Sequence, residues 1–365
     1  MAKSASVDVQ KSNWEGSIPI AISLASTSLS SPTIPPSLHR IISRQSYLHI
    51  ALEDEVRMFH EFAPVTCFRS VTQKDVTSNE NGEENDKGDN AIDEAKDKQQ
   101  GNASNLNDEM AKKEAVSDGK TPYPVCWFED EETGLPLRWH IFVGVLHDMF
   151  CIKQQEPSMH RLPWKIRIHF TSYPATLLPV ISSHQKSKDT DVIRCIFQYY
   201  LNSLKQSLYV QYNSGKVAKN MTKQSHLQLW DGIVRNQYEV YRSIASDLDG
   251  NITVGGNSNA EISCTCSSIP LRILVDARPA FSRPCRLDAK DSEEIITLGN
   301  VLQECLPDLF PTAGDSGILA EENSVGKTPR YLIQGIHVPL ESHILDIWKS
   351  LSHPDRFLYI AVSTH

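Results

Sequence analysis

The stretch from residue 189 to residue 248 constrains the fold of this chain more than any other. Apolar residues recur there at spacings of three and four, the period of one face of an α-helix. The first set is Ile193, Phe197, Tyr200, Leu201, Leu204 and Leu208, and the second is Trp230, Ile233, Val234, Tyr238, Tyr241, Ile244 and Leu248. Ser225 and Gln228 form a potential capping box before the second set. The spacing predicts two amphipathic helices, with Lys205 at the edge of the first.

The residues before this helical pair have the pattern of a small mixed sheet. Alternation of apolar with small or polar residues predicts half-buried strands, and apolar residues that recur three and four positions apart predict helices. Gly134 can supply the positive φ of a hairpin turn, and Pro64 ends a helix. The expected elements are a strand at 14–25, a helix at 48–62, a hairpin at 125–141, a helix at 143–150 and a strand at 164–170. This is an α+β set.

The final hundred residues have a similar order of elements. Two strands at 271–275 and 281–287, a helix at 298–306, a strand at 331–336, a short helix at 344–351 and a strand at 357–362 are expected. Two strands, a helix, a strand, a short helix and a strand are the order of the β-grasp, the topology of ubiquitin. The fold class predicted is therefore α+β, with two ubiquitin-like β-grasp domains flanking a helix-rich domain.

Two polar segments interrupt this pattern. Residues 74–120 contain 13 acidic and 7 basic residues and no aromatic one, so they contribute 7 − 13 = −6 of the net charge of −9. Such a segment cannot bury enough apolar surface to offset its chain entropy, which predicts a disordered loop. The domains expected are a flexible N-terminus (1–13), an N-terminal ubiquitin-like domain (14–185) with the acidic insertion, a helix-rich domain (186–248), a linker (249–268) and a C-terminal ubiquitin-like domain (269–365).

Composition limits the function classes. The net charge of −9 and pI near 5.8 argue against a broad nucleic-acid-binding surface, since phosphate binding needs clustered lysines and arginines. No apolar run approaches the roughly 18 residues of a membrane helix, and residues 1–15 lack the apolar core of a signal peptide. A cytoplasmic protein is expected. The 8 cysteines are dispersed without a framework spacing, which indicates buried thiols.

Motifs that could carry catalysis are few. Gly314-Asp315-Ser316-Gly317 matches the tetrapeptide around the nucleophile of trypsin-like proteases, but no histidine lies in the motif that this chemistry requires. A serine hydrolase using Ser316 is kept as a much weaker alternative to a binding role. Cys264-Thr-Cys266 is at most half of a metal site, and His140 and His147 are interpreted as structural histidines. We expect no catalytic residue, no cofactor and no metal.

Several motifs, taken in order, are specific to one family. They are Trp14-Glu15-Gly16 with Ile18-Pro19, Trp127-Phe128-Glu129 followed by Gly134-x-Pro136-Leu137-x-Trp139-His140, the strand from Pro163-Trp164 to Phe170, Gln228-Leu229-Trp230, and His353-Pro354-Asp355-x-Phe357-Leu358. The chain resembles the autophagy-related protein 5 family along nearly its whole length, apart from the insertion and the linker. The match looks closest to plant members.

The resemblance implies a conjugation acceptor. Members of this family receive the ubiquitin-like autophagy-related protein 12 on one lysine, and the matching position here is Lys205, in Asn202-Ser203-Leu204-Lys205. The conjugate pairs with autophagy-related protein 16. Together they act like a ligase, with the conjugating enzyme of autophagy-related protein 8, to join that protein to phosphatidylethanolamine at the phagophore membrane. Recruitment of a cytoplasmic protein to the pre-autophagosomal membrane, through partners, is therefore expected.

An acceptor needs no catalytic triad of its own. Isopeptide formation requires an uncharged amine that attacks a thioester, and the thioester belongs to partner enzymes. On its residues alone, Lys205 is one solvated lysine among several, and Lys216, Lys219 and Lys223 are its neighbours in sequence. Many family members carry an acidic residue after the acceptor, whereas this chain has Gln206.

Overall fold

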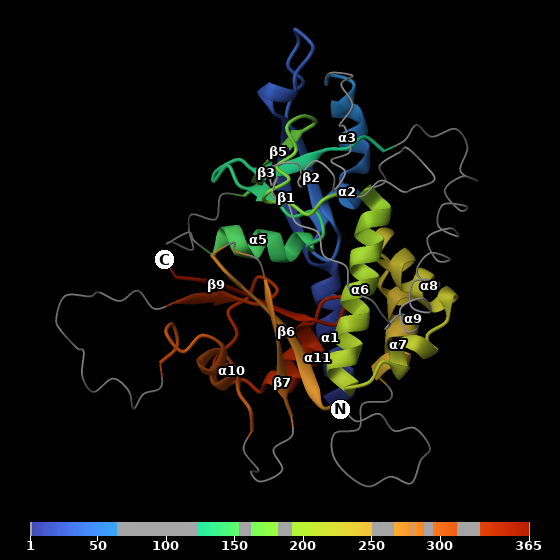
Figure 1. The fold of residues 1–365 in the computed structure, drawn as a ribbon, viewed down its shortest axis with the longest axis vertical. Helices are drawn as coiled ribbons and strands as arrows, with labels where there is room; N and C mark the ends of the chain where they lie inside the picture. The colour runs from blue at the N-terminus through green and yellow to red at the C-terminus, as the bar shows by residue number, and fades with distance from the viewer. Residues whose placement is uncertain are drawn as a thin grey trace, which may run out of the picture.

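The computed structural model describes residues 2–63, 123–152, 162–181, 192–249, 266–276, 278, 280–287, 295–311 and 329–364. The acidic insertion predicted at 74–120 and most of the linker predicted at 249–268 lie outside these ranges. Figure 1 shows one sheet at the top, a second sheet below it and a group of helices at the side of both. The predicted fold class is confirmed by this arrangement.

The N-terminal sheet has the strand order β2-β1-β5-β3-β4. Its central strands β1 and β5 are parallel, with Ile22 opposite Ile166, and the other neighbours are antiparallel. Parallel first and last strands at the centre of a mixed sheet are the mark of the β-grasp. The elements are β1 (Ser17–Leu24), η1 (Ser26–Ser28), β2 (Leu38–Ser43), α2 (Leu48–Ala51), α3 (Glu53–His60), β3 (Trp127–Asp130), β4 (Pro136–Leu137), α5 (Val143–Cys151) and β5 (Trp164–His169).

Most predicted elements of this domain are confirmed, including the hairpin turn at Gly134 with φ +67°. The helix expected at 48–62 is divided at Leu52, whose φ of −120° and ψ of 24° interrupt the helical path. Strand β2 was missed. It is an edge strand with three consecutive exposed residues, so it lacks the alternation that marks a half-buried strand. Its pairing with β1, from Ser17 opposite Ser43, defines it.

The C-terminal sheet has the order β7-β6-β9-β8, again with a parallel central pair, β6 and β9. Each predicted element of this domain is present. The elements are β6 (Ser268–Val275), β7 (Phe281–Arg286), α10 (Leu298–Cys305), β8 (Arg330–Leu332), α11 (Ile344–Leu351) and β9 (Leu358–Ser363). A capping box at Thr297 and Asn300 begins α10.

The helix-rich part consists of α6 (Val192–Tyr212), α7 (Lys216–Asn220), α8 (Lys223–Val234) and α9 (Tyr238–Asp249). The first predicted helix is confirmed, but the second is two helices, α8 and α9. Asn236, with φ +51°, turns the chain between them. The predicted cap at Ser225 is also wrong, because the Thr222 side chain accepts the Ser225 N–H at 3.0 Å. Both helices present apolar faces to the same core, so the three-to-four spacing of apolar residues runs on through the turn and the sequence pattern does not show it.

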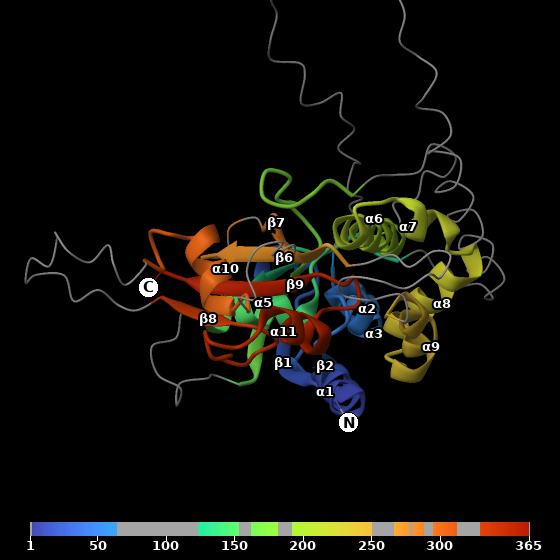
Figure 2. The same cartoon turned by 90° about the horizontal axis from the view of Figure 1, so that it is seen from below.

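The N-terminus expected to be flexible over 1–13 is a helix, α1 (Ala2–Glu15). Its contacts are with residues far along the chain, which no local pattern shows. The side chain of Gln10 donates to the Lys349 carbonyl, and Asn13 Nδ2 donates to the Ser350 carbonyl at 3.0 Å. The Trp14 ring stacks on Tyr241 with centroids 4.8 Å apart. Figure 2 shows α1 beside α11.

One hydrophobic core extends from the N-terminal sheet through α6, α8 and α9 to one face of the C-terminal sheet. The six residues of β9 are all buried. Leu358, Ile360 and Val362 point into the C-terminal domain's own core, whereas Tyr359 and Ala361 join the shared core. Helix α5 lies against this second face (Figure 1). The face of the C-terminal sheet turned away from its own helices is therefore covered by the rest of the molecule.

Candidate functional site

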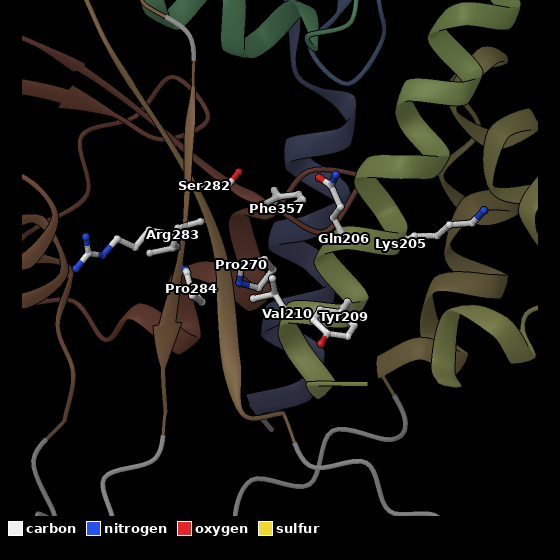
Figure 3. A pocket seen from close by; sticks show the side chains of 10 residues that line it. Lys205, Gln206, Tyr209, Val210, Pro270, Ser282, Arg283, Pro284 and Phe357 are labelled. Carbon is white, nitrogen blue, oxygen red and sulfur yellow. The ribbon is translucent and has the colours of Figure 1, made fainter. Parts of the chain in front are cut away.

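Lys205 lies in α6, the longest helix in the described part of the chain. The apolar stripe of α6 is buried, with Phe197, Leu201 and Leu204 at most 4% exposed. Lys205 follows Leu201 by one helical turn, so it lies at the border of this stripe and is half-buried. Its ammonium makes no hydrogen bond or ion pair with any residue that the structure describes. Figure 3 shows its side chain directed toward the helices α7 to α9.

Three polar side chains of α6 around Lys205 bond to the C-terminal domain and fix the helix against it. Their partners lie 66 to 152 residues away along the chain, on β6 and in the turn before β9. Ser203 Oγ donates to Asp355 Oδ2, Gln206 Oε1 accepts from Arg272 Nη2 at 3.3 Å, and Gln211 Oε1 accepts from Arg356 Nε and Nη2 at 3.2 Å.

Asp355 is the centre of this junction. Its carboxylate accepts hydrogen bonds from Tyr359 Oη at 2.8 Å and from Arg272 Nη1 at 3.3 Å. Arg272 also lies over the Phe357 ring, with its guanidinium carbon 3.8 Å from the centroid. Burial raises the pKa of Asp355 above its ordinary value, and the Arg272 charge and the bond from Ser203 oppose that rise. Gln206 is the hydrogen-bond acceptor for the arginine in this network.

Helix α8 covers the side of α6 on which Lys205 lies. The Trp230 ring packs against Phe197 at 5.2 Å and Tyr200 at 5.7 Å, measured between centroids. His226, one turn before Trp230, is buried, and its Nδ1 donates to the Thr222 carbonyl at 2.9 Å. Burial lowers the pKa of His226, the bond to Thr222 raises it, and the charge of Lys205 lowers it again.

The neighbouring lysines have different settings. Lys216 and Lys219 are exposed on the five-residue helix α7, which has no buried residue, and Lys223 is exposed at the start of α8. A short helix without a buried face gives its side chains little positional restraint. Among these four lysines, Lys205 is the half-buried one on a long, packed helix.

A groove with a volume of about 380 Å³ runs between α6 and the strands β6 and β7. Figure 3 shows Pro270, Ser282 and Pro284 on its strand side, while the Lys205 ammonium points away from it. The lining residues are Lys205, Gln206, Tyr209, Val210, Pro270, Leu271, Ser282, Arg283, Pro284 and Phe357. Only the base of Lys205 belongs to this groove, so the groove and the amine face different sides of α6.

The residues of the weaker motifs contribute no site in the described ranges. Ser316 and Cys264 lie outside those ranges, and Cys266 is buried beside the Ser268 carbonyl. Burial lowers the pKa of His140 to about 3, which fits a structural histidine. Among the described residues, no group of three or more potential metal ligands is present. Within the same ranges, no helix combines the length and apolar composition needed to cross a bilayer.

One pair of described side chains resembles a thiol dyad. Cys151 Sγ lies 3.1 Å from His147 Nε2, on adjacent turns of α5. Burial and, after it, the charge of Asp148 raise the pKa of the Cys151 thiol to about 12. The nucleophilic form of cysteine is the thiolate, so this pair is not prepared for nucleophilic catalysis at neutral pH.

Two ubiquitin-like domains around a helical bundle define the class of protein to which this chain belongs. Three family models match along it: "Autophagy protein ATG5, UblA domain" at residues 13–79 and 109–170, "Autophagy protein ATG5, alpha-helical bundle region" at 193–249, and "Autophagy protein ATG5, UblB domain" at 268–362. The chain belongs to the autophagy protein 5 family, whose proteins act in autophagy.

Curated relatives come from fungi and plants. Autophagy protein 5 of Phaeosphaeria nodorum is 23% identical over 264 residues, covering 65% of this chain and 75% of the relative. The protein of Oryza sativa subsp. japonica is 23% identical over 308 residues, covering 65% and 77%. That of Arabidopsis thaliana is 22% identical over 282 residues, covering 65% and 78%.

A solved structure supports the fold. The crystal structure of Kluyveromyces marxianus Atg5 matches with a TM-score of 0.59 and 16% identity, covering 98% of this chain and 100% of that one. At this identity the likeness concerns the fold alone, and it extends over all three parts of the molecule.

Proposed function

We propose that this protein accepts the ubiquitin-like autophagy-related protein 12 on Lys205 through an isopeptide bond. Membership of the autophagy protein 5 family supports the class of reaction. The observation that carries the choice of residue is the setting of Lys205: a half-buried lysine on a long helix, with neighbours Ser203 and Gln206 bonded to another domain. A nucleophile held on a rigid element loses less freedom when it meets the thioester.

In this role the chain is an acceptor and a scaffold, and the activation and the thioester come from partner enzymes. The conjugate would pair non-covalently with autophagy-related protein 16. It would then act like a ligase by bringing the conjugating enzyme of autophagy-related protein 8 to phosphatidylethanolamine. The substrate class is thus a pair of ubiquitin-like proteins, one attached to this chain and one transferred to lipid.

We further propose that the protein is cytoplasmic and reaches the phagophore membrane through its partners. The net charge of the chain supports recruitment through partners and not through direct binding to lipid. Outside residues 74–120 the net charge is −9 − (−6) = −3, which gives no general attraction to anionic lipid. The same near-neutral balance gives no broad surface for nucleic acid. A hydrolase using Ser316 remains without a supporting observation in the described residues.

The first prediction is that Lys205→Arg abolishes the covalent adduct. The chain is incubated with the activating and conjugating enzymes, autophagy-related protein 12 and ATP, and the adduct is measured by intact mass and by peptide mapping of the branched lysine. Arginine keeps the charge of Lys205, but its guanidinium is not a nucleophile at neutral pH. The unmodified chain should give one adduct, mapped to Lys205.

Lys216→Arg and Lys219→Arg are the matched controls, because they make the same change at exposed lysines of the next helix. Both should form the adduct at the unmodified rate. An undiminished adduct in Lys205→Arg would contradict the site assignment, and the failure of the unmodified chain to form any adduct would contradict the proposed function itself.

A further inference from the structure

The helices around Lys205 carry charge of one sign. Between residues 192 and 230 the sequence has five basic residues and no acidic one, although the whole chain has 45 acidic residues and a net charge of −9. The chain's average content would place several acids in a stretch of this length. A local excess of one charge raises the concentration of partners of the opposite charge at that surface.

Three of these basic residues form an exposed group. Lys216 and Lys219 lie on α7, and Lys223 is the first residue of α8. All three side chains are exposed, whereas Val217 and Ala218 pack against the hydrophobic core, so the lysines of α7 lie on its outer side. We call Lys216, Lys219 and Lys223 the lysine surface. Its first two members are three residues apart on one helix, where like charges repel.

The described part of the bundle does not neutralise the lysine surface. None of its three ammonium groups makes a hydrogen bond or ion pair with a described residue. The acids of α8 and α9 have other partners, because Asp231 pairs with Arg235 at 3.0 Å and Glu239 pairs with Lys11 at 3.4 Å. Asp247 is exposed on α9 and makes no ion pair with the lysine surface.

The direction of the Lys205 side chain relates the lysine surface to the acceptor. Helix α7 contacts α6, and Figure 2 shows the two side by side. Lys205 leaves α6 on the side where α7 to α9 lie (Figure 3). A protein that carries a thioester has to bring its sulfur-bound carbonyl to the Lys205 amine, so it has to cover this side of α6. The lysine surface therefore faces the arriving protein or borders its footprint.

We propose that the lysine surface docks an acidic surface of the conjugating enzyme that carries the thioester, an inference that rests on the function proposed above. Opposite charges speed the encounter of two proteins and fix their relative orientation. The three lysines contribute no atom to the isopeptide bond, so they act before the chemical step. An anionic membrane has the matching charge too, but only the enzyme is required to reach this side of α6.

The test is a variant with Lys216→Glu, Lys219→Glu and Lys223→Glu together. Its adduct formation is followed in single turnover over a range of concentrations of the preformed thioester of autophagy-related protein 12 on its conjugating enzyme. Electrostatic steering changes association rates by about 10- to 10³-fold, so we expect the half-saturating concentration to rise at least about tenfold in dilute salt. The rate at saturation should stay unchanged.

Two controls separate charge from other effects. The variant with all three lysines replaced by arginine keeps the charge and should conjugate like the unmodified chain. Lys165→Glu reverses an exposed lysine on β5, in the N-terminal sheet, and should leave the half-saturating concentration unchanged. A loss in the arginine variant equal to that in the glutamate variant would show that charge is not the cause, and it would overturn the proposal.

Salt provides a measurement that does not depend on the folding of a variant. The rate of the unmodified chain, below saturation, should fall as the salt rises from about 0.05 M to 0.5 M, because ions screen charges that are exposed. The glutamate variant should lose this dependence. A rate of the unmodified chain that does not change with salt would overturn the proposal, and so would a glutamate variant that loses rate at saturation with an unchanged half-saturating concentration.

Flotation with vesicles of phosphatidylserine and phosphatidylcholine tests the membrane alternative. If the glutamate variant loses vesicle binding but conjugates at the unmodified rate, the lysine surface serves the membrane and the proposal is wrong. The proposed function fails in a different way, namely when the unmodified chain gives no adduct at Lys205. An adduct at Lys205 with equal kinetics in the unmodified chain and the glutamate variant contradicts the docking site alone.

Discussion

Arg272 connects the helix that carries Lys205 to the C-terminal sheet. Its guanidinium bonds to Gln206 and to Asp355, and it covers the Phe357 ring. Replacing it leaves the buried Asp355 carboxylate without its counter-ion, and breaking such a pair costs about 3–5 kcal/mol of stability. Gln206, the residue after Lys205, is therefore part of the junction between domains.

We predict that Arg272→Met lowers the free energy of unfolding by about 3–5 kcal/mol at pH 7.5 and by less at pH 5. Burial already raises the pKa of Asp355, and without Arg272 that pKa rises further. A carboxyl group with a raised folded-state pKa is tolerated when protonated at low pH, and its stability is lost as the pH rises through that value. Urea unfolding at both pH values measures the difference.

Arg283→Met is the control for this change. Arg283 pairs with Glu304 at 3.1 Å, but the two side chains are 47% and 68% exposed. Exposed pairs contribute about 0–1 kcal/mol, with little dependence on this pH range. A loss in Arg272→Met equal to that in Arg283→Met, or one that does not grow with pH, would contradict the role given to the buried pair.

At the scale of elements, the turn between α8 and α9 depends on one glycine. A Cβ atom at Gly232 would lie 2.8 Å from the Tyr241 backbone nitrogen and from its Cβ, closer than side-chain carbons approach in folded proteins. The absence of a side chain at Gly232 lets the two helices pack in direct contact. This contact places Tyr241 where Trp14 of α1 stacks on it.

Gly232→Ala should therefore destabilise the protein by about 1–3 kcal/mol, although alanine is the better helix former. Thermal unfolding measures the change. Gly215→Ala is the matched substitution, because the nearest atom to its added Cβ is the flexible Lys219 Cε at 3.9 Å, and it should change stability by a few tenths of a kcal/mol. Equal stability of the two variants would exclude the proposed close contact.

At the scale of the whole molecule, Asp148 joins the two ubiquitin-like domains. Its carboxylate bonds to Arg44 Nη2 at 2.6 Å and accepts the Gly335 N–H at 2.7 Å from the opposite domain. Gly335 has φ +78°, which favours glycine, and a Cβ there would lie 3.0 Å from Arg44 Nη1. The same junction includes the bond between Gln45 and Gln334 at 3.1 Å.

Asp148→Asn should lower the free energy of unfolding by about 3 kcal/mol at pH 7, since it leaves Arg44 without its buried counter-ion. Burial alone would raise the pKa of Asp148, but the neighbouring His147 and the charge and hydrogen bonds of Arg44 bring it below the usual value. The difference between wild type and variant is therefore fully present above about pH 4 and shrinks as the pH falls through the lower folded-state pKa.

Chemical unfolding from pH 2.5 to 7 provides the measurement. Glu239→Gln, which removes an exposed partner of Lys11, is the comparison and should have little effect at any pH. A stability difference for Asp148→Asn that persists undiminished at the lowest pH would contradict the assignment of its effect to the ionised carboxylate.

The sequence by itself determined the type and order of most elements, because periodicity and turn chemistry act over a few residues. Lys205 as the acceptor stays a prediction, which rests on family position and not on local chemistry. The sequence did not show the role of Gln206, because its hydrogen-bond partner Arg272 lies 66 residues away.

Only the tertiary structure decided the helix at the N-terminus, the edge strand β2 and the division of α8 from α9. The first two depend on contacts between distant segments, α1 with α11 and Tyr241, and β2 with β1, whereas the third depends on the turn at Asn236, where Gly232 meets Tyr241. Contacts between distant segments cannot be predicted from a short stretch of the sequence. For the same reason, the sequence placed Lys205 at the edge of an apolar stripe, whereas only the folded molecule decided that its neighbours Ser203 and Gln206 bond to the C-terminal domain.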